Sequence, residues 1–366
     1  MTMFHRDGSC KPSLWGLVLA AGDGRRLQSY IRKVRGEDLP KQYVNFIGRR
    51  SMLEHTFDRV ERLIPARQIV TVVSKSHLRY GAVRSQLARR APQDVVVQPE
   101  NKETGPGVLL PLMHIYKRCP EAIVAVFPSD HFILEEDRFM DHVNLAARAV
   151  AHDSSRFVLL AMEAQHPEVE YGYILPRADE GSVSLWGMRS TARFVEKPDP
   201  ATARSLIHCG ALWNTMIMVF KVCTVLEAMQ KLCPTMYSRF TRILDAIGTA
   251  DETKITDEIY QTLEPLNFST AFLEKFADTS PDMLSVLPVL QVSWSDWGSP
   301  KRLLRTHKLL GRPAQRVNRR RRSSVPAYAQ RKNNRRDIVL WRADTGSSAK
   351  RNVTHDLERV IGSGPV

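Results

Sequence analysis

Four short apolar stretches in the first 130 residues alternate with amphipathic stretches, and this alternation constrains the fold most strongly. The apolar stretches have the length and continuous hydrophobicity of strands buried on both faces: 14–21, 68–74, 94–99 and 122–128. Between them, apolar residues recur at helical spacing over 51–64, 78–91 and 107–119. Strands that alternate with helices build parallel sheets covered on both faces. The sequence therefore predicts an α/β fold.

The second half of the chain has a mixed pattern, so the sheet is expected to be mixed but mostly parallel. Further strands are predicted in 156–163, 171–177, 184–198 and 213–220, with two short ones in 284–299. Further helices are predicted at 223–232, 235–247, 251–263 and 300–310. We expect residues 1–311 to form one catalytic domain.

The net charge of the 366-residue chain is +14, but most of it is confined to the last 55 residues. Residues 312–366 are polar and contain 14 Lys and Arg against 4 Asp and Glu, which leaves only about +4 for the rest. We therefore expect a flexible basic tail that can contact anionic surfaces. Nucleic acid is not an expected partner of the body, and a nucleic-acid-binding protein is the weakest of the alternatives.

Five cysteines are present, at positions 10, 119, 209, 223 and 233, without a CxxC pair. An odd number without paired spacing argues against a disulfide framework and against a zinc site. The longest apolar stretches are too short to span a membrane. We therefore expect free, mostly buried cysteines and a cytoplasmic protein.

The first apolar stretch ends in a glycine turn, "LVLAAGDGRRL" (17–27), that is followed at once by Arg25 and Arg26. A glycine turn beside guanidinium groups offers donors to phosphate without steric bulk. The turn matches neither the dinucleotide fingerprint nor the P-loop, so an ordinary strand-to-helix turn remains an alternative. "PSD" (128–130) also follows a predicted strand, and both segments should therefore face one crevice.

The glycine turn, followed by "PKQ" (40–42), resembles the signature of sugar-1-phosphate nucleotidylyltransferases. The branch that it resembles most is that of mannose-1-phosphate guanylyltransferases, whose own pattern at this position is GGSGTRL followed by PKQ. Further matches follow in the family's order: "QPENKETGPG" to EPxxRNTAPA, "PSDH" to PADH, "PEVEYGYI" to PETGYGYI, "FVEKPD", "LWNTMI" to LWNSGI and "WSDWGS" to WxDVGSW. Together they cover about 14–310.

The resemblance implies a Rossmann-like, GT-A-like fold and a Mg²⁺-dependent reaction of GTP with mannose 1-phosphate that yields GDP-mannose and pyrophosphate. It assigns catalysis to Arg26, Lys41 and Asp130, and the metal to Asp130 and Asp296. The nucleotide would contact Ala20, Ala21, Gly22, Gly24, Arg25 and Gln98. The sugar phosphate would contact Gly172, Glu196, Lys197 and Asn214. A homo-oligomer is compatible with this assignment. No general base is expected at His131, because a phosphate monoester is already anionic at neutral pH.

Several positions depart from the family pattern. Ala21 and Met216 stand where glycine is expected, and Arg25 stands where threonine is expected, so it either contacts phosphate or points into solvent. Residues 98–107 differ at several positions, and 28–38 form what we interpret as an extended loop. Two alternatives remain: the same chemistry with another nucleotide or hexose, and a catalytically weak regulatory homologue.

Overall fold

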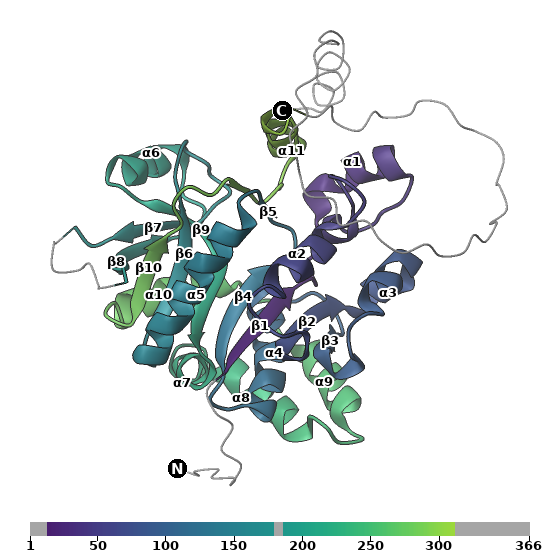
Figure 1. Cartoon of the computed structure of the whole chain (residues 1–366). Helices are drawn as coiled ribbons and strands as arrows, with labels where there is room; N and C mark the ends of the chain where they lie inside the picture. Colours follow the sequence, from purple (N-terminus) through teal and green to yellow (C-terminus); the bar gives the residue numbers. More distant parts are fainter. Residues whose placement is uncertain (1–12, 179–185, 312–366) are drawn as a thin grey trace, which may run out of the picture.

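The computed structural model describes residues 13–178 and 186–311, which are built around a nine-stranded sheet (Figure 1). The strand order is β3-β2-β1-β4-β9-β6-β10-β8-β7, and β5 and β11 form a separate two-stranded sheet. The strands are β1 (Leu14–Leu19), β2 (Ile69–Ser74), β3 (Val95–Gln98), β4 (Ile123–Pro128), β5 (Phe132–Ile133), β6 (Phe157–Glu163), β7 (Tyr173–Pro176), β8 (Arg189–Val195), β9 (Leu212–Lys221), β10 (Leu284–Pro288) and β11 (Trp294–Ser295).

Most strands of the large sheet run in one direction. Neighbours among β3, β2, β1 and β4 pair in parallel, and so do β6 and β10. Strand β9 lies antiparallel between β4 and β6, and β8 is antiparallel to both β10 and β7. The predicted α/β fold with a mixed, mostly parallel sheet is therefore confirmed.

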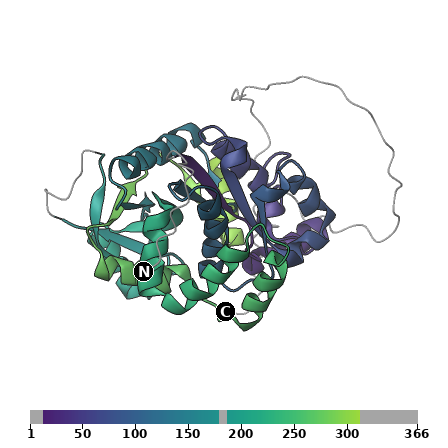
Figure 2. The same cartoon turned by 90° about the horizontal axis from the view of Figure 1, so that it is seen from below.

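Helices cover both faces of this sheet (Figures 1 and 2). One core cluster joins α1, α2, α5 and α6 to one face, and a second joins α4, α7, α8, α9 and α10 to the other. The helices are α1 (Arg25–Arg35), α2 (Met52–Val60), α3 (Gly81–Leu87), α4 (Thr104–Arg118), α5 (Glu136–His152), α6 (Pro200–His208), α7 (Val222–Leu232), α8 (Pro234–Ala246), α9 (Glu252–Thr262), α10 (Glu274–Thr279) and α11 (Pro300–Leu309), with single turns η1 (Lys41–Tyr43), η2 (Ala66–Gln68), η3 (Lys75–Arg79), η4 (Pro92–Asp94) and η6 (Ser269–Leu273).

Two local expectations were wrong. The stretch 28–38 is largely helix α1 rather than a loop, because Leu27, Tyr30 and Ile31 recur at helical spacing and are buried in one of the core clusters. Cys119 is disulfide-bonded, whereas Cys209, Cys223 and Cys233 are free. The cysteine pattern therefore gives no argument for a reducing compartment.

Part of the predicted strand 184–198 and the whole tail 312–366 lie outside the described residues, so the domain boundary after 311 stays a prediction. Across 13–178 and 186–311, no helix combines the length and the apolar content needed to cross a bilayer.

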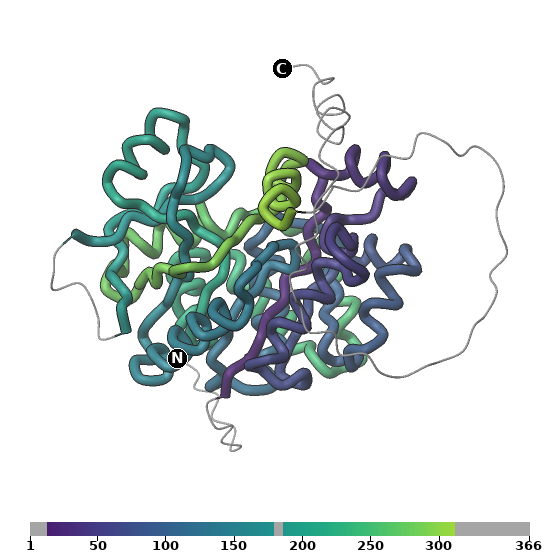
Figure 3. The backbone as a smooth tube through the Cα atoms, turned by 45° about the horizontal axis from the view of Figure 1, so that its top comes forward, coloured from purple at the N-terminus to yellow at the C-terminus, as the bar shows by residue number. Residues whose placement is uncertain are grey.

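Loops from distant parts of the chain meet at one end of the sheet. β1 and β4 are parallel neighbours, so the segments that follow Leu19 and Pro128 emerge side by side. The first and last helices of the described residues also meet at this end, because α1 lies next to the segment that leads into α11 (Figure 3). This end of the sheet is where ligands bind in such folds.

Gly105 illustrates how closely α4 packs against the segment after α9. Its backbone N–H donates to the Leu266 carbonyl at 2.7 Å, and a Cβ at Gly105 would lie 2.7 Å from that same oxygen. Gly81 in α3 has no such neighbour, since the nearest atom to a Cβ would be 3.9 Å away on Arg84.

We therefore expect opposite effects of Ala at the two glycines. Gly105→Ala should lower the free energy of unfolding by ~2–3 kcal/mol, because the backbone of the contacting segment must move. Gly81→Ala should be neutral or raise it by up to ~1 kcal/mol, since Ala favours helix over Gly. Urea unfolding of both variants checks this, and equal effects would contradict the close packing.

Candidate functional site

The glycine turn after β1 begins helix α1 and leaves room for a ligand. Gly24 has a φ of 62°, and a Cβ there would lie 3.0 Å from Cγ of Lys41, so both conformation and space require glycine. A Cβ at Gly22 would meet nothing within 4 Å. Ala20 and Ala21 are buried at the base of the turn. The turn is therefore closed on the Lys41 side and open at Gly22.

The short helix η1 holds this turn in place. The Gln42 amide donates to the carbonyls of Ala20 and Gly22, both at 2.8 Å, and the Tyr43 hydroxyl donates to Ala20 at 2.9 Å. Both side chains are buried. Sequence reasoning singled out Lys41 alone in this segment, although Gln42 lies in the quoted "PKQ". The structure gives the physical reason for that motif, since its Gln satisfies carbonyls of the glycine turn.

Lys41 connects the two residues that were predicted to bind metal. Its Nζ lies 2.9 Å from Oδ2 of Asp130 and donates to the backbone carbonyl of Asp296 at 2.7 Å. Asp130 follows β4 and Asp296 follows β11, so the tertiary structure brings together residues 166 positions apart. The Lys41 side chain is only 8% exposed, so its attraction to Asp130 is poorly screened by solvent.

Both carboxylates are ionised at neutral pH. Burial of the Asp130 carboxyl opposes ionisation, but the Lys41 ammonium and His131 together lower the pKa of Asp130 below its usual range. Burial acts in the same way on Asp296, and the positive charges of Lys41 and Arg302 again give a lowered pKa. Two charged carboxylates that sense each other's charge are suited to a hard cation.

The two oxygens of Asp296 have different surroundings. Oδ1 accepts from the Tyr171 hydroxyl at 2.7 Å, from the Gly298 N–H at 3.0 Å and from Arg302 at 3.0 Å. Oδ2 lies 3.0 Å from the same Arg302 nitrogen and 3.8 Å from Arg26. Oδ1 is thus anchored, and Oδ2 is the less saturated oxygen.

This donor set fits Mg²⁺ that arrives with a phosphate ligand. Among the described residues, no group of three or more His, Cys, Asp and Glu could hold a metal by itself. Mg²⁺, however, is usually held by one or two carboxylates together with substrate phosphates and water. Asp130 and Asp296 supply that number.

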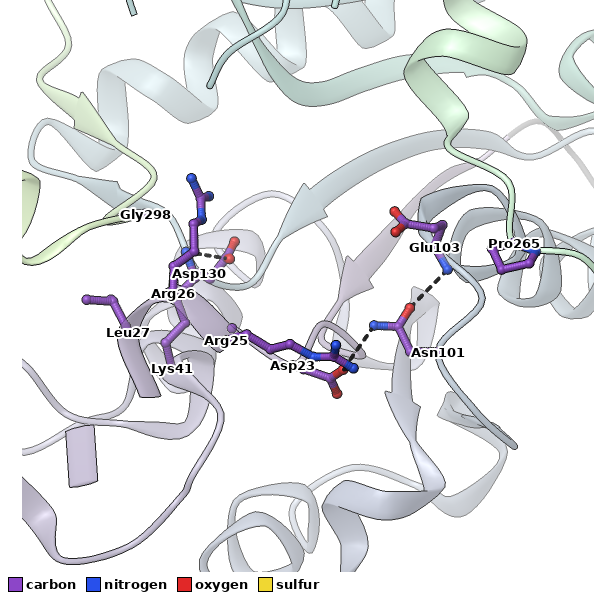
Figure 4. A pocket seen from close by; sticks show the side chains of 11 residues that line it. Asp23, Arg25, Arg26, Leu27, Lys41, Asn101, Glu103, Asp130, Pro265 and Gly298 are labelled. Carbon is purple, nitrogen blue, oxygen red and sulfur yellow. Dashed lines mark hydrogen bonds and ion pairs between the residues drawn. The ribbon is translucent and has the colours of Figure 1, made fainter. Parts of the chain in front are cut away.

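A cavity of about 500 Å³ opens beside these residues (Figure 4). Arg25, Arg26 and Lys41 give it a basic side, whereas Asp23, Asn101 and Glu103 form a linked polar side with Pro265 nearby. The full lining is Asp23, Gly24, Arg25, Arg26, Leu27, Lys41, Asn101, Glu103, Asp130, Pro265 and Gly298. Gln98, predicted to contact nucleotide, is buried at the end of β3 outside this lining, and its Oε1 has no partner within the described residues.

The two arginines of the turn differ in their contacts. Arg25 is 81% exposed and pairs loosely with Asp23 at 3.3 Å. Arg26 is 53% exposed and lies 2.6 Å from Glu170. Arg26 is therefore held by an acidic residue, whereas Arg25 borders the cavity and also faces solvent.

His131 lies beside Asp130 with its side chain 9% exposed, and its Nδ1 accepts from the Trp294 indole at 3.2 Å. Burial lowers the pKa of His131 to about 4, so the ring is neutral and only weakly basic at neutral pH. These contacts agree with a structural position rather than with the role of general base.

The four predicted sugar-phosphate residues are also brought together. Tyr173 pairs with Val195 on β8 and with Trp213 on β9. Their sequence neighbours Gly172, Glu196 and Asn214 therefore lie side by side. A Cβ at Gly172 would lie 2.6 Å from Oε2 of Glu196 and 3.2 Å from Cβ of Asn214. Lys197 lies 3.7 Å from Glu196. Glycine at 172 is thus required by its neighbours.

Glu196 stands in a crowded polar environment. Burial raises its pKa, and the Lys197 ammonium offsets only part of that effect. Its backbone N–H donates to Glu274 at 2.9 Å. Ser269 hydrogen-bonds its side chain and also contacts the sulfur of Met216 at 3.4 Å. Ser269 thus links the Glu196 carboxylate to Met216, the residue that replaces an expected glycine.

Strained backbone gathers at these loops. Five non-glycine residues in the described part of the chain have positive φ: Glu103, Lys197, Met216, Gln291 and Trp297. The first borders the cavity, the next two lie at the sugar-phosphate residues, and Trp297 follows Asp296. Such conformations cost about 1–3 kcal/mol each and are typical of functional sites.

Sequence reasoning missed a group of residues that hold Asp296. Arg302 contacts Asp296, Glu168 and Glu170, and its guanidinium lies 4.5 Å from the centre of the Tyr171 ring. Glu168, Glu170, Tyr171 and Asp296 lie within the segments quoted for the family resemblance, and Arg302 lies just after one of them. Nothing in the sequence shows that 168–171 and 296–302 meet.

Comparison with known proteins decides the family. The pattern of the nucleotidyl transferase family matches residues 15–312, which is most of the chain. The chain belongs to the nucleotidyl transferase family. This confirms the resemblance drawn from the glycine turn and the motifs that follow it.

Curated relatives are similar at modest identity. The xanthan biosynthesis protein XanB of Xanthomonas campestris pv. campestris is 28% identical over 290 residues, which cover 79% of this chain and 58% of that protein. A mannose-1-phosphate guanylyltransferase of Escherichia coli is 25% identical over 285 residues, with 77% and 58% covered. The chain thus spans little more than half the length of these curated relatives.

Solved structures support the fold of this nucleotidyl transferase. A structure titled mannose-1-phosphate geranyltransferase, from Thermus thermophilus, has a TM-score of 0.63 at 24% identity, covering 78% of this chain and 76% of that one. A structure titled mannose-6-phosphate isomerase, from Helicobacter pylori, has a TM-score of 0.58 at 19% identity, covering 77% and 99%. The predicted Rossmann-like nucleotidyltransferase fold is confirmed.

The ion pair between Lys41 and Asp130 should make a measurable contribution to stability. Lys41→Met leaves Asp130 without its cation, whereas Lys41→Met combined with Asp130→Asn removes both charges. We expect a coupling energy of about 1–2 kcal/mol in a double-mutant cycle, measured by urea unfolding without metal or nucleotide. The exposed pair Lys75–Asp257, at 3.4 Å, is the control and should couple by less than about 0.5 kcal/mol. Additive effects at Lys41 and Asp130 would contradict the pairing.

Proposed function

We propose that this nucleotidyl transferase family member transfers a nucleotidyl group from GTP to mannose 1-phosphate and forms GDP-mannose. In this reaction, a phosphate oxygen of the sugar 1-phosphate attacks the α-phosphorus of GTP. A new P–O bond forms at the α-phosphorus, the bond to the β-phosphate oxygen breaks, and pyrophosphate leaves. Two polyanions must approach each other, so the protein has to supply positioning and charge neutralisation.

The observation that carries this proposal is the placement of Lys41 between Asp130 and Asp296, at the edge of the cavity. Lys41 would contact phosphate near the α-position as a compact point charge. Arg26 would hold the β- and γ-phosphates, with Arg25 as a second contact. Bound between Asp130 and Asp296, Mg²⁺ would neutralise phosphate charge and orient the phosphate oxygens.

The nucleotide would enter over the open side of the glycine turn. Ala20, Ala21, Gly22 and Gly24 present backbone without bulky side chains, and Gly22 has free space around it. The polar side of the cavity, with Asn101 and Glu103, is available to the base and ribose. Gln98 is only 1% exposed and lies outside the lining of the cavity, which disfavours direct contact of its side chain with the nucleotide.

The sugar phosphate would bind where Gly172, Glu196, Lys197 and Asn214 converge. Glu196 accepts from sugar hydroxyls, Lys197 attracts the phosphate, and Asn214 offers an amide. The absence of a side chain at Gly172 keeps Glu196 in place and allows the hexose to approach the backbone.

Choice of mannose 1-phosphate and GTP rests on the motif pattern and on the name of the relative from Escherichia coli. Two alternatives remain: the same chemistry with another nucleotide or hexose, and a catalytically weak regulatory homologue. The retained Arg26, Lys41, Asp130, Lys197 and Asp296 disfavour the second. A cytoplasmic location, a homo-oligomer and an accessory role of 312–366 at anionic surfaces remain predictions.

A substrate panel tests the proposed specificity. Purified protein is assayed for pyrophosphate release with four nucleoside triphosphates crossed with several hexose 1-phosphates. GTP with mannose 1-phosphate should give the highest kcat/KM. Preference for UTP or dTTP with glucose 1-phosphate would contradict the proposed substrates but still support nucleotidyl transfer. No turnover with any pair would favour the alternative of a catalytically weak regulatory homologue.

Removal of either carboxylate charge tests the metal site. Asp130→Asn and Asp296→Asn should each lower turnover by about 10²-fold or more, because each removes one negative ligand with little change in size. Higher Mg²⁺ concentration should restore part of the activity. A folded variant with near-normal turnover and Mg²⁺ dependence would remove that residue from the metal site.

A further inference from the structure

Glu170 binds two arginines through one carboxylate oxygen. Its Oε2 lies 2.6 Å from Nη1 of Arg26 and 2.8 Å from Nη2 of Arg302. The two arginines differ in freedom, since the Arg26 side chain is 53% exposed and that of Arg302 is 8% exposed. Glu170 therefore connects a half-exposed cation at the cavity to a buried cation behind it.

Arg302 is fixed because it satisfies three carboxylates. One of its nitrogens lies 3.0 Å from both oxygens of Asp296, and the other lies 2.8 Å from Glu168 and from Glu170. Its guanidinium also stacks near the Tyr171 ring. Removal of one carboxylate would leave two partners on Arg302, so Glu170 is not required to neutralise it.

Arg26 has fewer carboxylate partners than Arg302. Besides Glu170 at 2.6 Å, Arg26 forms an ion pair in the described chain only with the more distant Asp296, at 3.8 Å. A polyphosphate that binds Arg26 comes close to the Glu170 carboxylate, and the repulsion between the two anions disfavours binding unless the carboxylate moves away. The same carboxylate can return to Arg26 when the anion leaves.

We propose that Glu170, oriented by Arg302, is a positioning residue that competes with polyphosphate for Arg26 and thereby sets the affinity of the site for the triphosphate and for pyrophosphate. This inference rests on the proposed function, which assigns Arg26 to the β- and γ-phosphates. Glu170 stands where the family pattern PETGYGYI has glycine, so the competing carboxylate is a feature of this chain.

The direction of the effect separates this role from a structural one. Loss of a residue that only supports the loop should weaken ligand binding, whereas loss of a competing charge should strengthen it. Glu170→Gln keeps the size of the side chain and removes its charge. Glu168→Gln is the matched control, since Glu168 lies in the same loop and bonds Arg302 at the same 2.8 Å, but no ion pair joins it to Arg26 in the described structure.

The experiment measures the binding of inorganic tripolyphosphate to the full-length protein by calorimetry, with EDTA present to exclude metal. Glu170→Gln should bind roughly fivefold more tightly than the unmodified protein, as expected for loss of a partly exposed charge contact. Glu168→Gln should leave affinity unchanged. Combined with Arg26→Met, Glu170→Gln should have no effect, because the competition acts through Arg26.

Each outcome supports or overturns the proposed competition. Unchanged or weaker binding by a folded Glu170→Gln variant overturns the inference while leaving the proposed function intact. Equal tightening by both Gln variants also overturns it, since general loss of negative charge would then be the cause. If the unmodified protein binds no tripolyphosphate and shows no turnover in the substrate panel, the proposed function itself fails, and the inference fails with it.

Discussion

The Lys41 ammonium, placed between Asp130 and the Asp296 carbonyl, is the interaction on which the rest of the site depends. It joins three segments that are distant in the chain: the short helix η1, the loop after β4 and the loop after β11. Because this lysine is almost fully buried, its position is determined by its neighbours rather than by solvent. Gly24 is required beside it for the same reason, since any Cβ there would press against the Lys41 side chain.

A pattern of paired charges extends from this lysine. Asp296 is shared by Lys41, Arg302 and the hydroxyl of Tyr171, and Arg26 is shared by Glu170 and Asp296. A buried cation such as the Lys41 ammonium costs free energy unless an anion or another hydrogen-bond acceptor accompanies it. Carboxylates therefore contact the side chains that we propose to bind phosphate, and under that proposal a phosphate ligand would rearrange these pairs rather than enter a preformed positive pocket.

Much of the fold could be predicted from local sequence. Continuous apolar stretches such as that of β4 are typical of strands covered on both faces, and the helical spacing within α4 and α8 was equally clear. The error at α1 has a physical reason. Most residues of α1 are basic or polar, and only Leu27, Tyr30 and Ile31 are buried. Three apolar residues among so many charged ones form too narrow an apolar face for the helical spacing to stand out.

The sequence by itself determined the family and the chemical types of residue at the site, because short motifs in a fixed order carry that information. It also located each predicted carboxylate and cation at the end of a strand or in a turn. Only the tertiary structure decided which charges meet. Asp296 lies beside Lys41, and Glu170 lies between Arg26 and Arg302, since the pairings of β11 with β5 and of β7 with β9 bring distant loops to one end of the sheet. Electrostatic pairing depends on distances of a few ångström, and no local pattern encodes these across more than a hundred residues.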